Sequence, residues 1–249
     1  MYSIFNTPHR QYKLKTDVFV CNKFGLAEFF SKHYVNFGDS RRINVLDVGC
    51  GVLPLGIFLA DQKQCNITGV ELNPIAYRCA RQNIIELKLV ESISLINANF
   101  EKFIKGYKGH KFDLIISNPP IDKPAKEKIA KYSNFLFETL DDESYSYLTN
   151  SWHSAEGKDL LDYIFEFSST ILKPNGRIII VFCNIGCTSS DYVFDKARRH
   201  NYESFKSITG EISSKSIGFR TLETKIISTN MVGFRKCQNY DSSKKSIRK

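Results

Sequence analysis

The sequence predicts one α/β domain built on a doubly wound, mostly parallel sheet of seven strands. From Arg42 to about residue 90, short apolar runs alternate with helix-like stretches, an order that is typical of β-α-β units. The apolar runs are nearly continuous, as expected of buried strands. With 249 residues and 42% hydrophobic side chains, the chain is long and apolar enough to bury one full core of this kind.

The first expected strand, residues 43–48, leads directly into a glycine turn and then into the apolar stretch 57–60. Gly49 and Gly51 allow the backbone to come close to a ligand, and the helix N-terminus behind them favours polar ligand groups. Pro54 suits the first turn of that helix. The order of strand, glycine turn and helix therefore predicts a binding site at the end of this strand.

The second expected strand, residues 67–70, ends in Glu71, about twenty residues beyond the glycine turn. An acidic residue at this place accepts hydrogen bonds from the two hydroxyls of a ribose. A helix over about 74–87 and a third strand at 93–96 follow. These features indicate a ligand that carries a ribose.

A dinucleotide is the alternative ligand for such a site. Its fingerprint requires a third glycine three positions after the second. Here Gly56 lies five positions after Gly51, and Asp47 before the turn is not part of the dinucleotide pattern. The spacing therefore disfavours a dinucleotide.

The fourth expected strand, residues 112–117, stops at the tetrapeptide Asn118-Pro119-Pro120-Ile121. Two consecutive prolines fix their φ angles and donate no backbone N–H, so neither a strand nor a helix continues through them. In such a rigid loop, the Asn118 side-chain oxygen and the Pro119 carbonyl can accept both protons of a planar NH2 group. The nitrogen lone pair then turns toward an electrophile on the opposite side.

After this loop the alternation of elements is interrupted and then resumes. Residues 122–156 form a long insertion rich in lysine and aromatic side chains, which could stack on a base, line a peptide groove or form a small local core. A helix is expected from Gly157, and the turn at 172–176 ends it. Beyond the turn we expect a strand beside the fourth one, a helix and a final pair of strands: residues 177–182, 190–200, 202–208 and 223–228.

The two ends of the chain are predicted to lie outside the domain. Residues 1–40 are expected to be an N-terminal extension with one amphipathic helix at 24–37, residues 41–235 the domain, and residues 236–249 a basic, disordered tail. No apolar run has the length of a transmembrane helix, and the first residues lack the features of a signal peptide. We therefore expect a cytoplasmic protein that does not contact a membrane.

The formal net charge is +9, which favours attraction to RNA, DNA, ribosomes or acidic protein partners. The basic surface is therefore a candidate contact for RNA or the ribosome. The seven cysteines are odd in number and scattered, as is typical of reduced thiols in a cytosolic protein. Cys183 and Cys187 are spaced like half of a zinc site, but no second pair has matching spacing, so no metal site is expected.

Three motifs together resemble those of a known enzyme family. Asp47-Val48-Gly49-Cys50-Gly51 and Gly69-Val70-Glu71-Leu72-Asn73-Pro74 resemble the first two motifs of the class I S-adenosylmethionine (SAM)-dependent methyltransferases. With Asn118-Pro119-Pro120-Ile121, they resemble the branch that methylates amide and amino nitrogens. The resemblance covers roughly residues 42–205. It implies a Rossmann-like SAM methyltransferase fold with an antiparallel last strand, and SAM as the cofactor.

The resemblance also implies a role for each motif. The residues that would bind the cofactor follow the first three strands: Asp47, Gly49, Cys50, Gly51, Glu71, Leu72, Asn99 and Phe100. Glu71 binds the ribose, Asp47 and the glycine turn face the methionine part, and Asn99 and Phe100 lie near the adenine. Cys50 is expected to be a small filler, because methyl transfer from a sulfonium needs no nucleophilic thiol. Asn118, Pro119, Pro120 and Ile121 hold the acceptor nitrogen in line with the methyl group.

The stretch after the Asn-Pro-Pro motif resembles the release-factor glutamine-N5 methyltransferases of the HemK type. In that group a long loop leads to an Asp-Gly-Leu-x-x-Tyr-like helix start, as about 35 residues lead to 157–163 here, and then to a Leu-Lys-Pro-x-Gly turn. Two features depart from the pattern: Ile121 stands where an aromatic residue is common, and residues 18–23 lack the Pro-Arg-Pro-Glu-Thr-like segment. Asn-Pro-Pro-Ile also resembles a variant among small-domain guanine-N2 ribosomal RNA methyltransferases.

Three functions follow from these resemblances. The leading interpretation is methylation of a protein glutamine at N5. The alternative is methylation of adenine N6 or guanine N2 in RNA or DNA, for which the base must be unpaired or flipped. The third is a SAM-fold subunit that binds a partner without catalysis, which the presence of both turn glycines, Glu71 and Asn118 disfavours.

Overall fold

The computed structural model describes residues 2–6, 11–15, 42–61, 65–119, 159–183, 190–213 and 226–237. Several expectations lie outside these residues: the helix at 24–37, Pro120 and Ile121, the insertion at 122–156 and the tail beyond 237. These remain predictions from the sequence, as do the domain boundaries.

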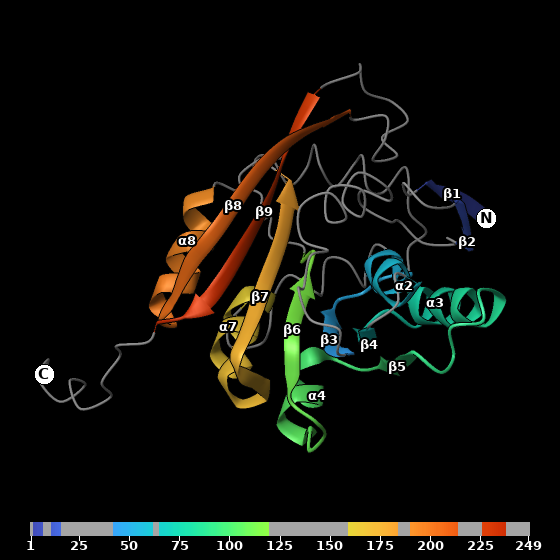
Figure 1. The fold of residues 1–249 in the computed structure, drawn as a ribbon, viewed down its shortest axis with the longest axis horizontal. Helices are drawn as coiled ribbons and strands as arrows, with labels where there is room; N and C mark the ends of the chain where they lie inside the picture. Colours follow the sequence, from blue (N-terminus) through green and yellow to red (C-terminus); the bar gives the residue numbers. More distant parts are fainter. Residues whose placement is uncertain are drawn as a thin grey trace, which may run out of the picture.

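The central sheet has seven strands in the order β5-β4-β3-β6-β7-β9-β8 (Figure 1). Their bounds are β3 Ile43–Val48, β4 Cys65–Glu71, β5 Ile93–Asn97, β6 Phe112–Ser117, β7 Leu172–Cys183, β8 Tyr202–Ser213 and β9 Ile226–Lys236. The pairs from β5 to β7 are parallel, whereas β9 runs antiparallel to both β7 and β8. The predicted mostly parallel, seven-stranded sheet with an antiparallel last strand is therefore confirmed.

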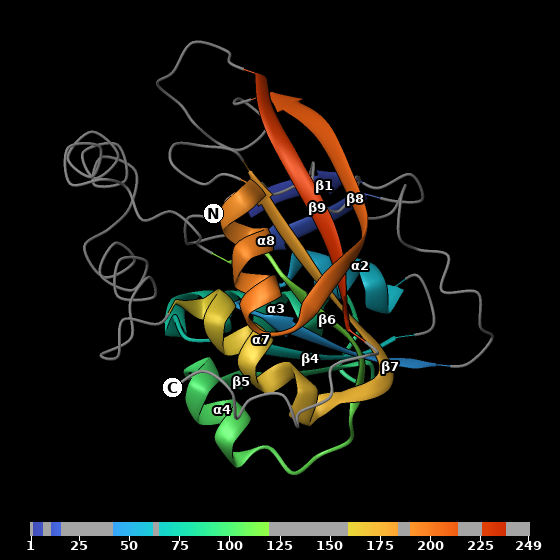
Figure 2. The same ribbon diagram turned by 90° about the vertical axis from the view of Figure 1, so that its left-hand side faces the viewer.

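Helices cover both faces of this sheet (Figure 2). Their bounds are α2 Pro54–Asp61, α3 Pro74–Glu86, α4 Phe100–Gly106, α7 Leu160–Ile171 and α8 Ser190–Arg199. One hydrophobic core lies between the sheet and α2 with α3, and the other between the sheet and α4, α7 and α8. On β3, Val45 belongs to the first core and Leu46 to the second, and both are fully buried. Burial on both faces explains why the strand reads as an almost continuous apolar run.

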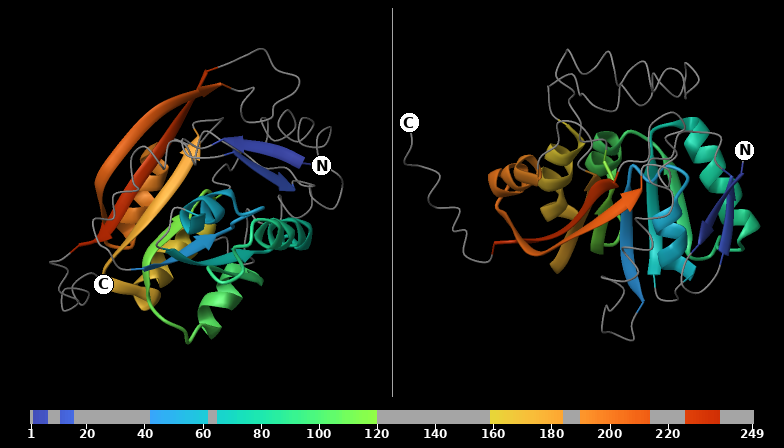
Figure 3. Two further views of the ribbon diagram at one scale, coloured as in Figure 1. Left: turned by 45° about the vertical axis from the view of Figure 1, so that its right-hand side comes forward. Right: turned by 90° about the horizontal axis from the view of Figure 1, so that it is seen from above.

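An N-terminal hairpin, for which the sequence indicated no element, packs against the helices of the first core. Its strands β1 Tyr2–Asn6 and β2 Gln11–Lys15 are antiparallel (Figure 3). Tyr12 and Leu14 are buried in the first core, and the Tyr12 hydroxyl donates a hydrogen bond to Asp61 at the end of α2. This part of the expected extension therefore contributes to the domain core.

The turn predicted at residues 172–176 lies inside strand β7 as an irregularity. Phe112 of β6 pairs with Leu172, but Leu114 pairs with Arg177, so four residues of β7 lie opposite one residue of β6. Pro174 has no backbone N–H to give to a ladder, and it tolerates such a bulge. The predicted start of the strand at 177 marks where regular pairing with β6 resumes.

The last strand was predicted too early in the chain. The expected strand at 223–228 overlaps only the beginning of β9, and β8 extends past the expected end at residue 208. The part of β9 that pairs with the centre of β7 is 230–234, whose apolar residues are interrupted by Asn230 and Gly233. The Phe205 ring fills the space over Gly233, where an added Cβ would lie 2.5 Å from Phe205 Cζ. The side chain over Gly233 thus comes from the neighbouring strand, which weakens the strand signal in β9.

In the part of the chain that the structure describes, every helix is too short or too polar to cross a membrane.

Candidate cofactor and acceptor site

Three polar segments meet at the carboxyl edge of the sheet. Strand β3 pairs with β4 on one side and with β6 on the other, and Val48 lies opposite both Val70 and Ser117. The strand order reverses at this point, where open α/β sheets usually bind ligands. The glycine turn after β3 therefore lies between Glu71 at the end of β4 and Asn118 after β6.

The glycine turn presents its backbone to open space. Gly49 and Gly51 have φ angles of +66° and +57°, a conformation that side-chain-bearing residues rarely adopt. The N–H groups of Gly49 and Cys50 donate to the Val70 carbonyl at 2.9 and 3.2 Å. Among the described residues, apart from Gly51 and its two chain neighbours, no heavy atom lies within 4 Å of the point where a Cβ of Gly51 would be. A ligand can thus approach the turn closely at Gly51.

Glu71 joins the glycine turn to the loop that follows β4. One carboxylate oxygen accepts from the Gly51 N–H and the other from the Asn73 N–H, each at 2.7 Å. Burial raises the pKa of Glu71, and these backbone hydrogen bonds oppose the rise. The Leu72 carbonyl accepts from the Asn97 amide at 3.1 Å, and the Glu71 carbonyl accepts from the same group at 2.7 Å. Asn97, which sequence reasoning missed, therefore holds this segment from β5.

Asp47 is buried beneath the glycine turn with one oxygen free of hydrogen bonds. Its side chain is 3% exposed, and burial raises its pKa to about 7, with a smaller contribution from the negative charge of Glu71. The Gly56 backbone N–H bonds to the carboxylate and opposes this rise. The second oxygen, Oδ2, has no hydrogen-bond partner among the residues that the structure describes. A buried carboxylate oxygen without a partner is suited to a cationic ligand group.

Cys50 fills space next to Asp47, as predicted. Burial, and then the charges of Asp47 and Glu71, raise the pKa of its thiol well above the usual range, so the reactive thiolate is disfavoured. Among the described residues, no group of three or more His, Cys, Asp or Glu side chains is placed to hold a metal ion. Cys187 lies outside these residues.

A strained segment closes the glycine turn, and Asn83 supports it. Leu53 is fully buried with a φ of +69°, an unfavourable angle for a leucine. The Asn83 amide donates to the Val52 carbonyl at 3.3 Å and to the Lys15 carbonyl at 3.2 Å. Its oxygen accepts from the Lys15 N–H at 2.6 Å. Asn83 thus ties the N-terminal hairpin to the loop, a role that no local sequence signal reveals.

Asn118 and Pro119 follow β6 directly and are tied to the strand that carries the glycine turn. The Ser117 hydroxyl donates to the Val48 carbonyl at 2.8 Å, and this contact is fully buried. Asn118 is partly exposed and Pro119 is buried. The backbone that leads into Asn118 is therefore held beside Val48, the residue that precedes Gly49.

Asn99 and Phe100 lie after β5, at the start of α4. The Asn99 oxygen caps this helix by accepting from the Glu101 and Lys102 N–H groups at 2.8 and 3.4 Å. The Phe100 ring is buried in the second core and stacks on Phe103. Both residues therefore have structural contacts, and their expected position near an adenine remains a prediction.

Leu160, which the sequence did not single out, contacts the glycine turn from the opposite side. Its Cδ2 lies 3.6 Å from the point where a Cβ of Gly49 would be. Leu160 is the first residue of α7, and the preceding Asp159 caps that helix. The site is therefore bordered by β3, β4, β6 and the start of α7.

This chain is similar to known proteins both in sequence and in fold. Residues 26–142 match the family model of the methyltransferase small domain. Over 177 residues the chain is 30% identical to a bifunctional methyltransferase of Rickettsia prowazekii, covering 65% of this chain and 32% of that protein. Over 164 residues it is 27% identical to a tRNA1(Val) (adenine(37)-N6)-methyltransferase of Histophilus somni, covering 66% of each chain.

A further relative is named for a different acceptor. Over 148 residues the chain is 30% identical to a protein of Methanocaldococcus jannaschii that is provisionally named a protein N5-glutamine methyltransferase, covering 59% of this chain and 64% of that protein. The chain thus spans about a third of the Rickettsia protein and slightly less than two thirds of the other two relatives.

A solved structure extends the likeness to most of the fold. A SAM-dependent methyltransferase from Agrobacterium tumefaciens superposes with a TM-score of 0.58 at 14% identity, covering 94% of this chain and 70% of that one. At this identity the likeness concerns the fold alone. Residues 26–142 are thus similar to the methyltransferase small-domain family, and the chain shares the fold of a SAM-dependent methyltransferase.

Proposed function

We propose that this protein transfers a methyl group from SAM to a planar amide or exocyclic amino nitrogen, with a protein glutamine N5 as the acceptor. One observation carries the proposal: the Ser117–Val48 hydrogen bond sets Asn118 and Pro119 beside the glycine turn that Glu71 holds. An uncharged acceptor of N–H groups next to a ribose-type site is what transfer between a sulfonium and an amide requires.

The residues around the glycine turn fit SAM. Glu71 offers carboxylate oxygens for the ribose hydroxyls, and the open space at Gly51 admits the ligand to the backbone. The unpartnered Oδ2 of Asp47 suits the methionine ammonium group. When bound, SAM would supply a methyl group on a positively charged sulfur, ready for attack by a lone pair.

The acceptor loop orients the attacking nitrogen. The Asn118 side-chain oxygen and the Pro119 carbonyl accept the two protons of the NH2 group, which turns its lone pair toward the glycine turn. Orientation of this kind can supply roughly 7–11 kcal/mol of the barrier reduction. Pro120 and Ile121 lie outside the described residues, and their assignment to the acceptor rests on the sequence motif.

A nucleic-acid base is the second candidate acceptor. Glutamine amide and adenine N6 both carry an NH2 group on a planar carbon, so one loop can hold either. The helix start and turn that resemble the HemK type favour glutamine, and so does the relative named for protein glutamine. The net charge of +9 and the relative named for tRNA adenine favour a base.

A labelled-methyl assay tests these alternatives. Total protein, RNA and DNA from cells that lack the gene are incubated with the protein and SAM that carries a labelled methyl group. We expect label in protein, recovered as N5-methylglutamine, and none with Asn118→Ala. Label in RNA or DNA, weakening steeply with added salt, would establish the second candidate. A protein that binds no SAM would contradict the proposal as a whole.

The buried carboxylate of Asp47 leads to a prediction about pH. Below pH 7 it is protonated in the free protein, because burial raises its pKa to about 7. A cationic ligand group favours the ionised form, so SAM affinity should rise between pH 5.5 and 7.5, by up to about tenfold per unit below the pKa. The stability of the free protein should change in the opposite direction. It binds a proton that the unfolded chain has lost above pH 4, so its unfolding temperature should fall as the pH rises toward 7.

Titration calorimetry and thermal unfolding across this pH range measure both trends. Glu71, whose pKa burial also raises, contributes in the same direction. Asp47→Asn is therefore the control, and it should flatten most of both slopes. Equal slopes in Asp47→Asn and wild type would show that another group titrates.

We also propose a cytoplasmic location and a methyltransferase domain at residues 41–235, to whose core Tyr12 and Leu14 of the N-terminal hairpin contribute. The odd number and the scattered positions of the seven cysteines favour a reducing compartment.

A further inference from the structure

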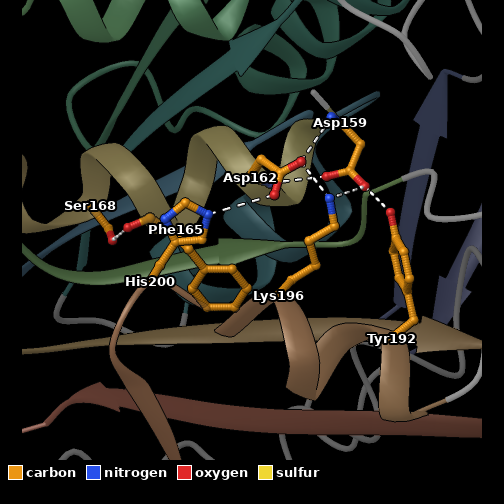
Figure 4. Close-up of polar contacts among 7 residues, drawn as sticks. All are labelled: Asp159, Asp162, Phe165, Ser168, Tyr192, Lys196 and His200. Carbon is orange, nitrogen blue, oxygen red and sulfur yellow. Dashed lines mark hydrogen bonds and ion pairs between the residues drawn. The ribbon is translucent and has the colours of Figure 1, made fainter. Parts of the chain in front are cut away.

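A cluster of charged and polar side chains joins the first turn of α7 to one face of α8 (Figure 4). We call it the α7–α8 clamp, and its members are Asp159, Asp162, Tyr192, Lys196 and His200. The Lys196 ammonium lies between the two carboxylates, 3.3 Å from Asp159 Oδ2 and in direct contact with Asp162 Oδ2. Tyr192 donates its hydroxyl proton to Asp159, and His200 Nε2 lies 3.6 Å from Asp162 Oδ1.

Lys196 is the group that allows two carboxylates to share this place. The side chains of Lys196 and Asp159 are each 12% exposed and that of Asp162 is 14% exposed, so water does little to separate their charges. Burial alone would raise the pKa of Asp162, but Lys196 and the neighbouring donors hold it below its usual range. Without the lysine, the two carboxylates would repel each other or one would take up a proton.

The clamp is continuous with the wall of the cofactor site. The Asp159 oxygen accepts from the Asp162 N–H at 2.9 Å, and the Asp162 oxygen accepts from the Asp159 N–H at 3.3 Å, which fixes the first turn of α7. Leu160 lies within this turn, and its Cδ2 lies beside Gly49, 3.6 Å from the point where a Cβ of Gly49 would be. A shift of Asp159 or Asp162 therefore moves the side chain that borders the glycine turn.

We propose that Lys196 is a positioning residue for cofactor binding: by holding Asp159 and Asp162 together, it keeps Leu160 against Gly49 and so forms one wall of the SAM site from α8. The inference rests on the proposed function, because SAM is the ligand. It goes further because it assigns part of the cofactor affinity to α8, a helix that lies after all three sequence motifs in the chain.

A clamp with only a structural role would lower stability without a selective effect on SAM. The matched control is Phe194→Leu, because Phe194 lies on the same helix and packs edge-on against Phe234 in the second core. That change loosens α8 without altering the charges around Asp159. Arg198→Met is the charge control, since Arg198 pairs with Asp195 on the exposed surface of the same helix.

The experiment measures SAM dissociation constants by titration calorimetry, and unfolding temperatures without ligand, for the full chain. We expect Lys196→Met to weaken SAM binding by about tenfold or more. The SAM dissociation constants of Lys196→Arg, Phe194→Leu and Arg198→Met should stay within about threefold of the wild-type value. Leu160→Ala, which leaves the clamp intact, should also weaken SAM binding, by about fivefold or more. This variant tests the wall directly if Lys196→Met does not fold.

Two outcomes would overturn the inference. One is wild-type affinity in a folded Lys196→Met protein or in Leu160→Ala. The other is an equal loss of affinity in Phe194→Leu at a matched drop in unfolding temperature. Wild-type protein that fails to bind SAM would instead refute the proposed function, so the two failures are distinguishable.

Discussion

Replacing Asn118 by alanine is expected to lower methyl transfer by about 100-fold or more, with SAM affinity nearly unchanged. The change removes the side-chain oxygen that would accept one proton of the acceptor NH2 group. The acceptor nitrogen then loses the orientation of its lone pair. Because this interaction exists only when the acceptor is bound, the change lowers turnover and leaves SAM binding unaffected. Single-turnover methyl transfer with saturating SAM, together with calorimetric SAM binding, measures the two effects separately.

The matched control is Asn66→Ala. Asn66 is an exposed asparagine on β4 whose amide contacts Asn44. Its removal should leave both turnover and SAM binding at wild-type levels. If Asn118→Ala transferred methyl groups as fast as wild type, the assignment of Asn118 to the acceptor would be wrong. A loss of SAM binding as large as the loss of turnover would instead move Asn118 to the cofactor side.

Replacing Glu71 by alanine is expected to have the opposite pattern, weakening SAM binding by about 100-fold, equivalent to about 2.7 kcal/mol. Glu71→Ala removes the acceptors for the ribose hydroxyls. It also leaves the Gly51 and Asn73 N–H groups, which donate to the carboxylate at 2.7 Å, without partners. Buried donors without partners are costly, so the unfolding temperature should fall as well.

Glu71→Gln separates the two losses, and Glu203→Ala is the control. Glutamine keeps one acceptor oxygen and the side-chain size, so it should retain more stability than alanine and still bind SAM more weakly than wild type. Glu203 on β8 forms an exposed ion pair with Arg235 on β9, and β8 is remote in the sheet order from the glycine turn. Removal of the Glu203 carboxylate should change neither the SAM affinity nor the unfolding temperature appreciably. Wild-type SAM affinity in Glu71→Ala would exclude Glu71 as the ribose ligand.

The elements that the sequence predicted best are those whose signals are local. Strands β3 and β6 are buried on both faces, so their residues are apolar almost without a break. Helix α3 begins where the Asn73 oxygen accepts from the Ile75 and Ala76 N–H groups and Pro74 takes the first position. Each of these features depends on residues adjacent in the chain, and a short window of sequence contains them.

The elements that were missed or displaced depend on distant partners. Strand β8 is an edge strand with exposed residues such as Glu203, and Phe205 of that strand fills the space over Gly233 of β9. The N-terminal hairpin is held by Asn83, 68 positions away from Lys15. Because a strand pairing takes its stability from residues far along the chain, its own sequence carries a weak signal.

By itself, the sequence determined that the sheet is mostly parallel, that a glycine turn follows β3 and Glu71 ends β4, and that β6 ends at Asn-Pro-Pro. Backbone rigidity, glycine conformations and apolar runs are properties of short segments, so they can be recognised in the sequence alone. Only the tertiary structure decided that Ser117 bonds to Val48 across 69 positions, that Asp47 keeps an unpartnered oxygen, and that Lys196 holds the start of α7. These contacts join residues from different strands and helices, and their energies come from burial, which exists only once the chain has folded.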